Sequence, residues 1–220
     1  MMNFLQRLYL KTKTSIVFFF VMVSDTLVYL FYRYQLETES LYRKSLSSKL
    51  SYDQLEKLIS SRSANYFFAP LTHVFTFAMV TLIITGIVTF GLYLFDYAVN
   101  FKATLKAVLV GKFVFVAMSI VNGIYFLFYR PENLLEIRHR NLLSAQLLFD
   151  YDSLSATEAS ALGAVNVFEF AFMLLTATCL AAYYKKSDST ELFFRIILGT
   201  YGLSFLVLTL IKIYFSMNTR

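Results

Sequence analysis

Long apolar runs alternate with short polar segments along this chain. Runs of eighteen or more residues with little charge predict transmembrane helices, because about 20 residues rising 1.5 Å each cross a hydrocarbon core about 30 Å thick. Backbone groups in lipid need hydrogen-bond partners within their own segment, so such runs are helices rather than open strands. The runs of about this length are 15–32, 71–95, 113–129, 161–184 and 192–215.

These runs predict an all-α, polytopic membrane protein, a five-transmembrane-helix bundle that forms a single membrane domain over residues 1–220. Tyrosines gather at the run ends, where an aromatic belt lies at the level of the lipid headgroups. With five spans, the amino-terminal face (side A) also carries the connectors after the second and fourth runs. The opposite face (side B) carries the 33–70 loop, the 130–160 loop and the carboxyl end.

Composition supports a membrane protein. The chain is 58% hydrophobic and 15% charged, whereas soluble domains carry about 25% charged residues. The net charge of +6 comes from basic residues that flank the runs instead of forming one stripe, so the expected partner is the lipid bilayer and not nucleic acid. The single cysteine, Cys179, excludes an intrachain disulfide and a cysteine-based zinc site. No metal or cofactor motif is present, so no cofactor is predicted.

Basic residues are divided almost evenly between the two faces. Side A spreads its lysines over short, acid-poor segments at membrane edges, among them Lys102, Lys106 and Lys112 in the connector after the second run. Because the positive-inside rule counts such segments, the chain is predicted to be a multi-pass protein with a cytoplasmic amino terminus. The membrane is either a bacterial cytoplasmic membrane or a eukaryotic endomembrane.

The 33–70 loop contains a helix-start pattern. Ser51 and Gln54 in "SYDQLEKLIS" have capping-box spacing, and the leucines and isoleucine that follow repeat on one helical face. This pattern predicts a short amphipathic helix on the bilayer surface. It is either a docking element for a partner or a polar connector that covers the end of the bundle.

The 130–160 loop predicts a second interfacial helix. The segment "RPENLLEIRHRNLLSAQLLF" places Pro131 at a plausible first helical position and Glu136 four residues before Arg140. Its leucines are too many for a solvated loop, so one side of the helix is expected against acyl chains or the rim of the bundle.

A few polar residues interrupt the apolar runs. A charge at the bilayer centre costs about 2.5–3.5 kcal/mol on insertion scales, so such residues normally face inward and pair. When each run is centred on the bilayer, these residues fall in the half nearer side B, with His73 at the entrance on that side. They predict one polar cluster inside the bundle, made of Asp25, Asn122, Asn166, Glu169 and Lys212.

Two interpretations of this cluster stay open. In the first, the carboxylates of Asp25 and Glu169 form a proton or cation relay. In the second, the asparagines, Glu169 and Lys212 hydrogen-bond the helices together, which contributes about 0.6–2 kcal/mol for each pair in membranes.

Residues from about 79 to 215 resemble the Yip1-like membrane proteins. The resemblance rests on an apolar hairpin, the leucine-rich stretch "LLSAQLLF", a polar turn, and "VNVFEFAFMLL" leading into a second hairpin. It implies a five-helix bundle with a cytoplasmic amino terminus and no catalytic residues. Eukaryotic relatives act in vesicle traffic and bind Rab-type GTPases. This chain lacks an Asp-Leu-Tyr-Gly-Pro stretch, so GTPase binding is not carried over, and only Asn166 to Glu169 are mapped onto the family.

Two functions follow from these patterns. The first is a non-enzymatic scaffold, assembly or trafficking factor that presents its surface helices to a membrane-protein partner or to a second copy. The second is a small transporter or channel that uses Asp25 and Glu169 as an intramembrane carboxylate relay. Five spans do not form the paired inverted repeats common in secondary carriers unless the chain dimerises.

Overall fold

The structure is a computed structural model that describes residues 9–149, 156–184 and 190–218. Every element in these ranges is a helix, and one isolated bridge pairs Ser144 with Asn166. Two segments are π-helical (η1 and η5) and one is a 3₁₀ helix (η2). The elements are α2 (Thr14–Phe31), η1 (Tyr32–Leu36), α3 (Glu39–Leu46), α4 (Tyr52–Ala64), α5 (Phe68–Leu94), α6 (Phe101–Phe128), α7 (Leu134–His139), η2 (Ala145–Leu148), α8 (Ala156–Ala164), α9 (Val167–Tyr183), α10 (Thr190–Ile197), η5 (Leu198–Gly202) and α11 (Leu203–Asn218).

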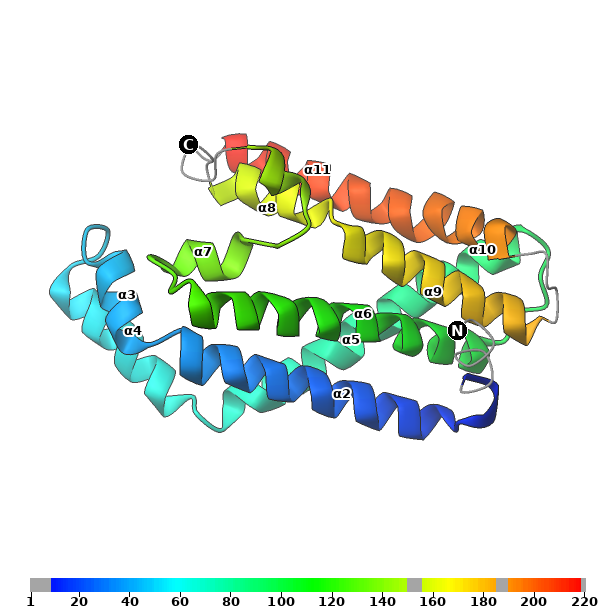
Figure 1. Cartoon of the computed structure of the whole chain (residues 1–220), viewed down its shortest axis with the longest axis horizontal. Helices are drawn as coiled ribbons and strands as arrows, with labels where there is room; N and C mark the ends of the chain where they lie inside the picture. Colours follow the sequence, from blue (N-terminus) through cyan, green and yellow to red (C-terminus); the bar gives the residue numbers. More distant parts are fainter. Residues whose placement is uncertain (1–8, 150–155, 185–189, 219–220) are drawn as a thin grey trace.

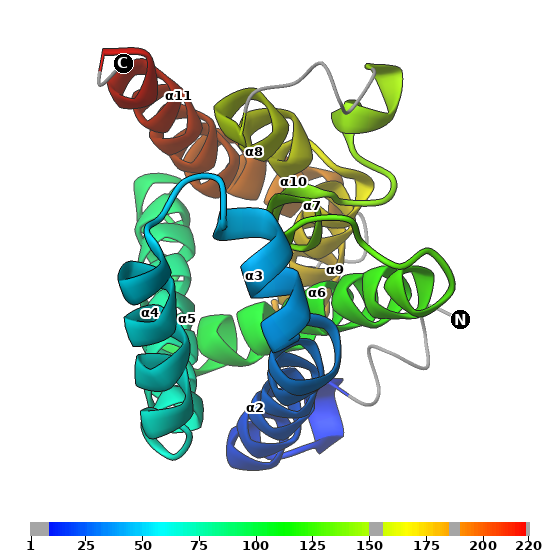
Figure 2. The ribbon, with the colours of Figure 1, turned by 90° about the vertical axis from the view of Figure 1, so that its left-hand side faces the viewer.

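Five rods make the bundle: α2, α5, α6, α9 and the continuous α10–η5–α11 (Figure 1). Successive rods run in opposite directions, so α2 begins at one end and α11 finishes at the other. Helix α6 lies at the centre and packs against α2, α5 and α9. We call the end that carries α3, α4 and α7 the B end and the opposite one the A end; Figure 2 looks onto the B end.

Four helical stretches are long and apolar enough to cross a membrane: Thr14–Leu36, Phe68–Leu94, Phe101–Phe128 and Thr190–Ile211. Their outward side chains are largely apolar and exposed, as for Phe19, Phe75 and Leu208. Such a surface needs lipid, because a soluble protein rarely exposes a contiguous apolar patch of more than a few hundred Å². The all-helical, membrane-type fold predicted from the sequence is confirmed at this level.

The third predicted run, 113–129, starts too late. Helix α6 begins at Phe101, where the Asn100 side chain accepts a hydrogen bond from the Ala103 amide at 3.0 Å. An asparagine in this position caps a helix by pairing one of its free amides. The supposed basic connector is therefore the first half of a membrane helix, and Lys106 and Lys112 are buried in the bundle.

The fourth predicted run, 161–184, is not one helix. It breaks between α8 and α9, where Asn166 accepts from the Glu169 amide at 2.9 Å and caps α9. A continuous helix over this run would place the two polar residues one turn apart on the same face, but their spacing is that of an N-cap and the third helical residue. Helix α9 alone has 17 residues.

The helix predicted in the 33–70 loop is present as α4, and Ser51 and Gln54 form the expected capping box. A preceding helix, α3, was not predicted; its Leu41 and Tyr42 are buried against α7 and the end of α6. Arg43 of α3 lies 2.5 Å from Glu56 of α4. This hydrogen bond lowers the pKa of the Glu56 carboxyl below its usual range. The pair holds α3 and α4 together as a hairpin over the B end.

The helix predicted across the 130–160 loop is much shorter. Helix α7 has six residues and starts after Asn133, which caps it, instead of at Pro131. Leu143 then adopts a positive φ of 61°, a conformation that a helix does not tolerate. The expected pairing of Glu136 with Arg140 is confirmed at 2.5 Å.

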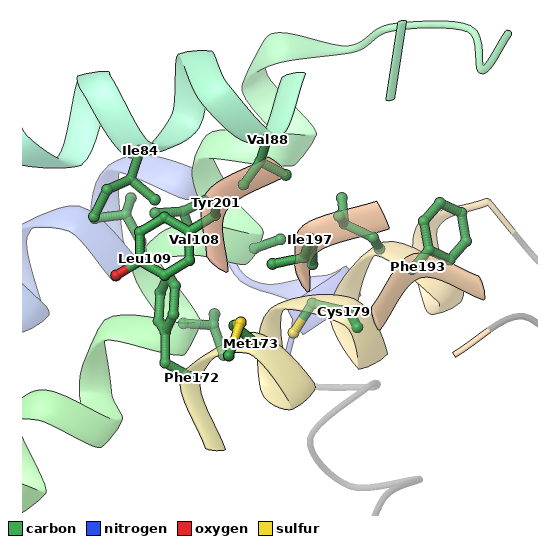
Figure 3. Close-up of a cluster of buried hydrophobic side chains, with 14 of the residues drawn as sticks. Ile84, Val88, Val108, Leu109, Phe172, Met173, Cys179, Phe193, Ile197 and Tyr201 are labelled. Carbon is green, nitrogen blue, oxygen red and sulfur yellow. The ribbon is translucent and has the colours of Figure 1, made fainter. Parts of the chain in front are cut away.

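Apolar side chains from α5, α6, α9 and α10 pack together in the bundle interior, as Figure 3 shows. Val88 of α5, Leu109 of α6 and Ile197 of α10 are fully buried there. Lys106 is buried nearer the A end, in the second turn of α6, whereas the pair of ionisable groups described next lies towards the B end.

Candidate functional site

An acid and a histidine face each other inside the bundle. Asp25 lies near the middle of the Thr14–Leu36 stretch, and His73 lies in the second turn of α5. His73 Nε2 is 2.7 Å from Asp25 Oδ2, and both side chains are 26% exposed. The imidazole ring also stacks on Tyr29, with ring centroids 4.1 Å apart. The histidine is thus fixed between a carboxylate and an aromatic ring.

Two adjoining cavities reach this pair from the B end. The larger, of about 720 Å³, lies between α2, α4 and α5, and the smaller, of about 280 Å³, extends from it towards Asp25. Tyr29, Glu37 and His73 line both cavities. The pair therefore has a route for water and small solutes from the B end.

A lysine lies deeper, at the middle of the bundle. Lys112 of α6 is 8% exposed and donates a hydrogen bond to Thr81 Oγ1 at 2.9 Å. Its ammonium lies 4.1 Å from the centroid of the Phe77 ring. Asp25 is close enough to interact with it electrostatically. Since a desolvated lysine without a carboxylate is costly in a membrane, Asp25 and Lys112 stabilise each other.

Two arginines line the mouth of the larger cavity. Arg33 in η1 donates to the Arg62 carbonyl at 3.1 Å, and Arg62 in the last turn of α4 donates to the Arg33 carbonyl. Arg62 also lies 3.2 Å from Glu37 and 4.4 Å from the ring centroid of Tyr42. This reciprocal clasp joins the ends of two helices, where the helix dipoles favour positive charge.

The two asparagines of the predicted cluster belong to a different network. Asn122 donates to Asn141 at 3.2 Å and accepts from the Leu142 amide at 3.1 Å. Asn141 and Asn166 both donate to the Gly163 carbonyl, at 3.1 and 3.0 Å. These bonds tie α6 to the loop after α7 and to the α8–α9 break, so the role of both asparagines is structural.

Glu169 lies on yet another helix pair. Its Oε2 accepts a hydrogen bond from the hydroxyl of Tyr201 at 3.0 Å, which joins α9 to the π-helical η5. The ring of Tyr201 packs edge-on against Phe172. No described contact joins Glu169 to Asp25, and Lys212 is a helical residue of α11 whose side chain lies outside the described part of the chain.

The structure thus divides the predicted polar cluster. Asp25 is paired with His73 and acts on Lys112, the asparagines form a structural network, and Glu169 binds Tyr201. Lys112 is absent from the predicted cluster because a lysine normally marks the end of an apolar run. The missed signal was Asn100, a capping residue followed by an uninterrupted stretch of helix-forming residues.

Comparisons of this chain with models of protein families, with curated proteins and with solved structures find no match. The resemblance to Yip1-like proteins therefore stays a prediction. The chemistry of the site rests on its own residues and geometry.

Proposed function

We propose that the chain is a non-enzymatic, five-span integral membrane protein of the small-transporter type. In this proposal, the Asp25–His73 pair exchanges a proton with water in the B-end cavities and couples it to a solute. The observation that carries it is that His73 lines both cavities while bonded to an intramembrane carboxylate. Ionisable groups inside a membrane bundle commonly mark proton and solute pathways, and imidazole exchanges protons near neutral pH.

Apolar packing between Lys112 and the A end supports the same proposal. A carrier exposes its site to one face at a time, and Val108 and Leu109, about one turn before Lys112 on α6, are fully buried between it and the A-end cavity that Lys106 lines. The described arrangement then corresponds to a state open towards side B and closed towards side A. Because five spans lack the paired repeats common in carriers, a homodimer is the proposed working unit.

Helix α9 is proposed as the fifth span. Its 17 residues extend about 25 Å at 1.5 Å per residue, and it packs along α6 and α10 at their depth. Single cysteines replacing Leu148 or Glu191, in a Cys179→Ser background, test this count. If α9 crosses, membrane-impermeant reagents are expected to label the two positions from opposite faces. Labelling of both positions from one face would leave four spans.

Proton movement into proteoliposomes under an imposed membrane potential tests the function. The wild-type protein is expected to acidify the lumen, and Asp25→Asn and His73→Gln to lose most of that rate, because each removes one proton-exchanging group. Glu169→Gln is the matched control: it also neutralises an intramembrane carboxylate, yet it lies outside both cavities. Retained transport in Asp25→Asn, or loss in Glu169→Gln alone, contradicts the proposed relay.

A scaffold that binds a membrane partner is the second candidate. Helix α4 favours it, since it buries only Leu55 and exposes Tyr52 and Leu58 beyond the bundle end. If wild-type proteoliposomes move no proton or solute at any pH, the transporter proposal is overturned and the scaffold remains. Either function is compatible with the predicted cytoplasmic amino terminus, but Lys106 and Lys112 are buried in α6 and no longer count among the side A residues that support it.

A further inference from the structure

We infer that Arg33 and Arg62 form a binding site for a phosphate group at the mouth of the larger B-end cavity. The inference rests on the proposed function in naming a class of ligand for the same cavity. The site is distinct from the Asp25–His73 pair, which lies further along the cavity wall.

Unused donor capacity is the first observation. Arg33 gives one hydrogen bond from Nη1 to Tyr29, at 3.3 Å, and one from Nη2 to the Arg62 carbonyl. Its Nε is buried and has no hydrogen-bond partner in the described structure. A guanidinium carries five N–H donors in a planar fork, so one N–H on each Nη atom remains for a ligand in the cavity that Arg33 lines.

Charge is the second observation. Glu37 is the acidic residue among those that line the larger cavity, and it is already 3.2 Å from Arg62. Arg33 has no carboxylate paired with it in the described structure, so the mouth of the cavity carries an excess positive charge. An anion compensates this charge, and arginine pairs with phosphate through two parallel hydrogen bonds.

Preorganisation is the third observation. The reciprocal bonds between the arginines fix both side chains before any ligand arrives, which reduces the entropy lost on binding. Arg33 is carried by the π-helix η1, a rare distortion that is frequent at functional sites. Ser61, Asn65 and Thr72 line the same cavity and add polar side chains, and a volume of about 720 Å³ suits a phosphate ester as well as phosphate itself.

The phosphate has two possible sources, a lipid headgroup and a soluble phosphate compound. Arg33 lies in the last turns of the first span, and the exposed rings of Tyr66 and Phe67 mark the nearby start of α5. Aromatic side chains in this position indicate headgroup depth. Both sources reach the cavity mouth, so the experiment has one arm for each.

In the first arm, the full-length protein in neutral detergent is titrated calorimetrically with inorganic phosphate, and chloride at matched ionic strength is the reference. In the second arm, the melting temperature of the protein is compared between nanodiscs of phosphatidylglycerol and nanodiscs of phosphatidylcholine. Arg33→Gln and Arg62→Gln are each expected to weaken phosphate affinity by at least about tenfold, as expected for loss of a charge-assisted bond. If the ligand is a lipid, each is expected to reduce the rise in melting temperature that phosphatidylglycerol gives the wild type by an amount that corresponds to the same loss of affinity.

Arg43→Gln is the matched control, because Arg43 pairs with Glu39 and Glu56 away from the cavity. It is expected to bind as the wild type does. Arg33→Lys keeps the positive charge and loses the planar fork of donors. If Arg33→Gln melts early without ligand, Arg33→Lys is the variant to compare, and it is expected to bind phosphate more weakly than the wild type. A response to free phosphate identifies a soluble source, and a response to phosphatidylglycerol alone identifies lipid.

Absence of both responses in the wild type, or equal loss in Arg43→Gln, overturns the phosphate site. The assay needs no transport, so it fails independently of the proposed function. Asp25→Asn is expected to lose proton movement while it retains phosphate binding.

Discussion

Gly111→Val is expected to destabilise the bundle by at least about 1–3 kcal/mol, the usual cost of overpacking a core. A Cβ at Gly111 would overlap Thr176 Oγ1 and lie 2.8 Å from Phe172 Cδ2. Both residues belong to α9 and are fully buried, so neither has room to withdraw. Because α6 and α9 form the central contact of the bundle, the added volume must separate these two helices.

The matched control is Gly86→Val, which makes the same change within a membrane helix. A Cβ at Gly86 meets nothing within 4 Å, so only the difference in helix propensity remains. Thermal unfolding in detergent, followed by the loss of monodisperse protein, compares the two variants. Equal melting temperatures would show that α6 and α9 do not pack as described.

Lys112→Met is expected to destabilise the bundle and to abolish proton movement. Removing one partner of a buried pair of charges costs up to about 3–5 kcal/mol, because the other group, here Asp25, is left without its compensating charge. The Thr81 hydroxyl loses the hydrogen bond that it accepts from Lys112 but keeps the one that it donates to the Phe77 carbonyl, at 2.6 Å. Asp25 keeps its hydrogen bond with His73. Loss of the ammonium removes the buried positive charge that acts on Asp25.

Lys102→Met is the control, since Lys102 is exposed in the first turn of the same helix. Melting temperature and proton movement are measured on both variants. A lysine kept only for packing would give a different pair of results, in which Lys112→Met melts no earlier than the wild type and still moves protons. Lys102→Met is expected to match the wild type in both measurements.

The buried lysine also shows why the predicted site was incomplete. Asp25 was found from the sequence because a carboxylate is conspicuous in an apolar run. Lys112 was not, because lysines at run ends normally extend to the membrane surface. Its burial depends on which face of α6 meets α2 and α5, and that face is decided by contacts between helices far apart in the chain.

Glu169 illustrates the opposite error. Its spacing from Asn166 was taken as one face of a continuous helix, which placed both residues in a shared intramembrane cluster. The same spacing is typical of a helix start. The bridge between Ser144 and Asn166 turns the chain at that point, and this pairing is not visible from hydropathy.

The sequence by itself determined the all-helical, membrane-type fold, most span positions and the capping box of α4, because hydropathy and capping are local properties that act within about one helix turn or one run. Tertiary structure alone decided the pairing of Asp25 with His73, the burial of Lys112, the arginine clasp and the separation of Glu169. Each of these depends on the rotation and depth of neighbouring helices. Those are set by side-chain packing between segments distant in sequence, which no local pattern encodes.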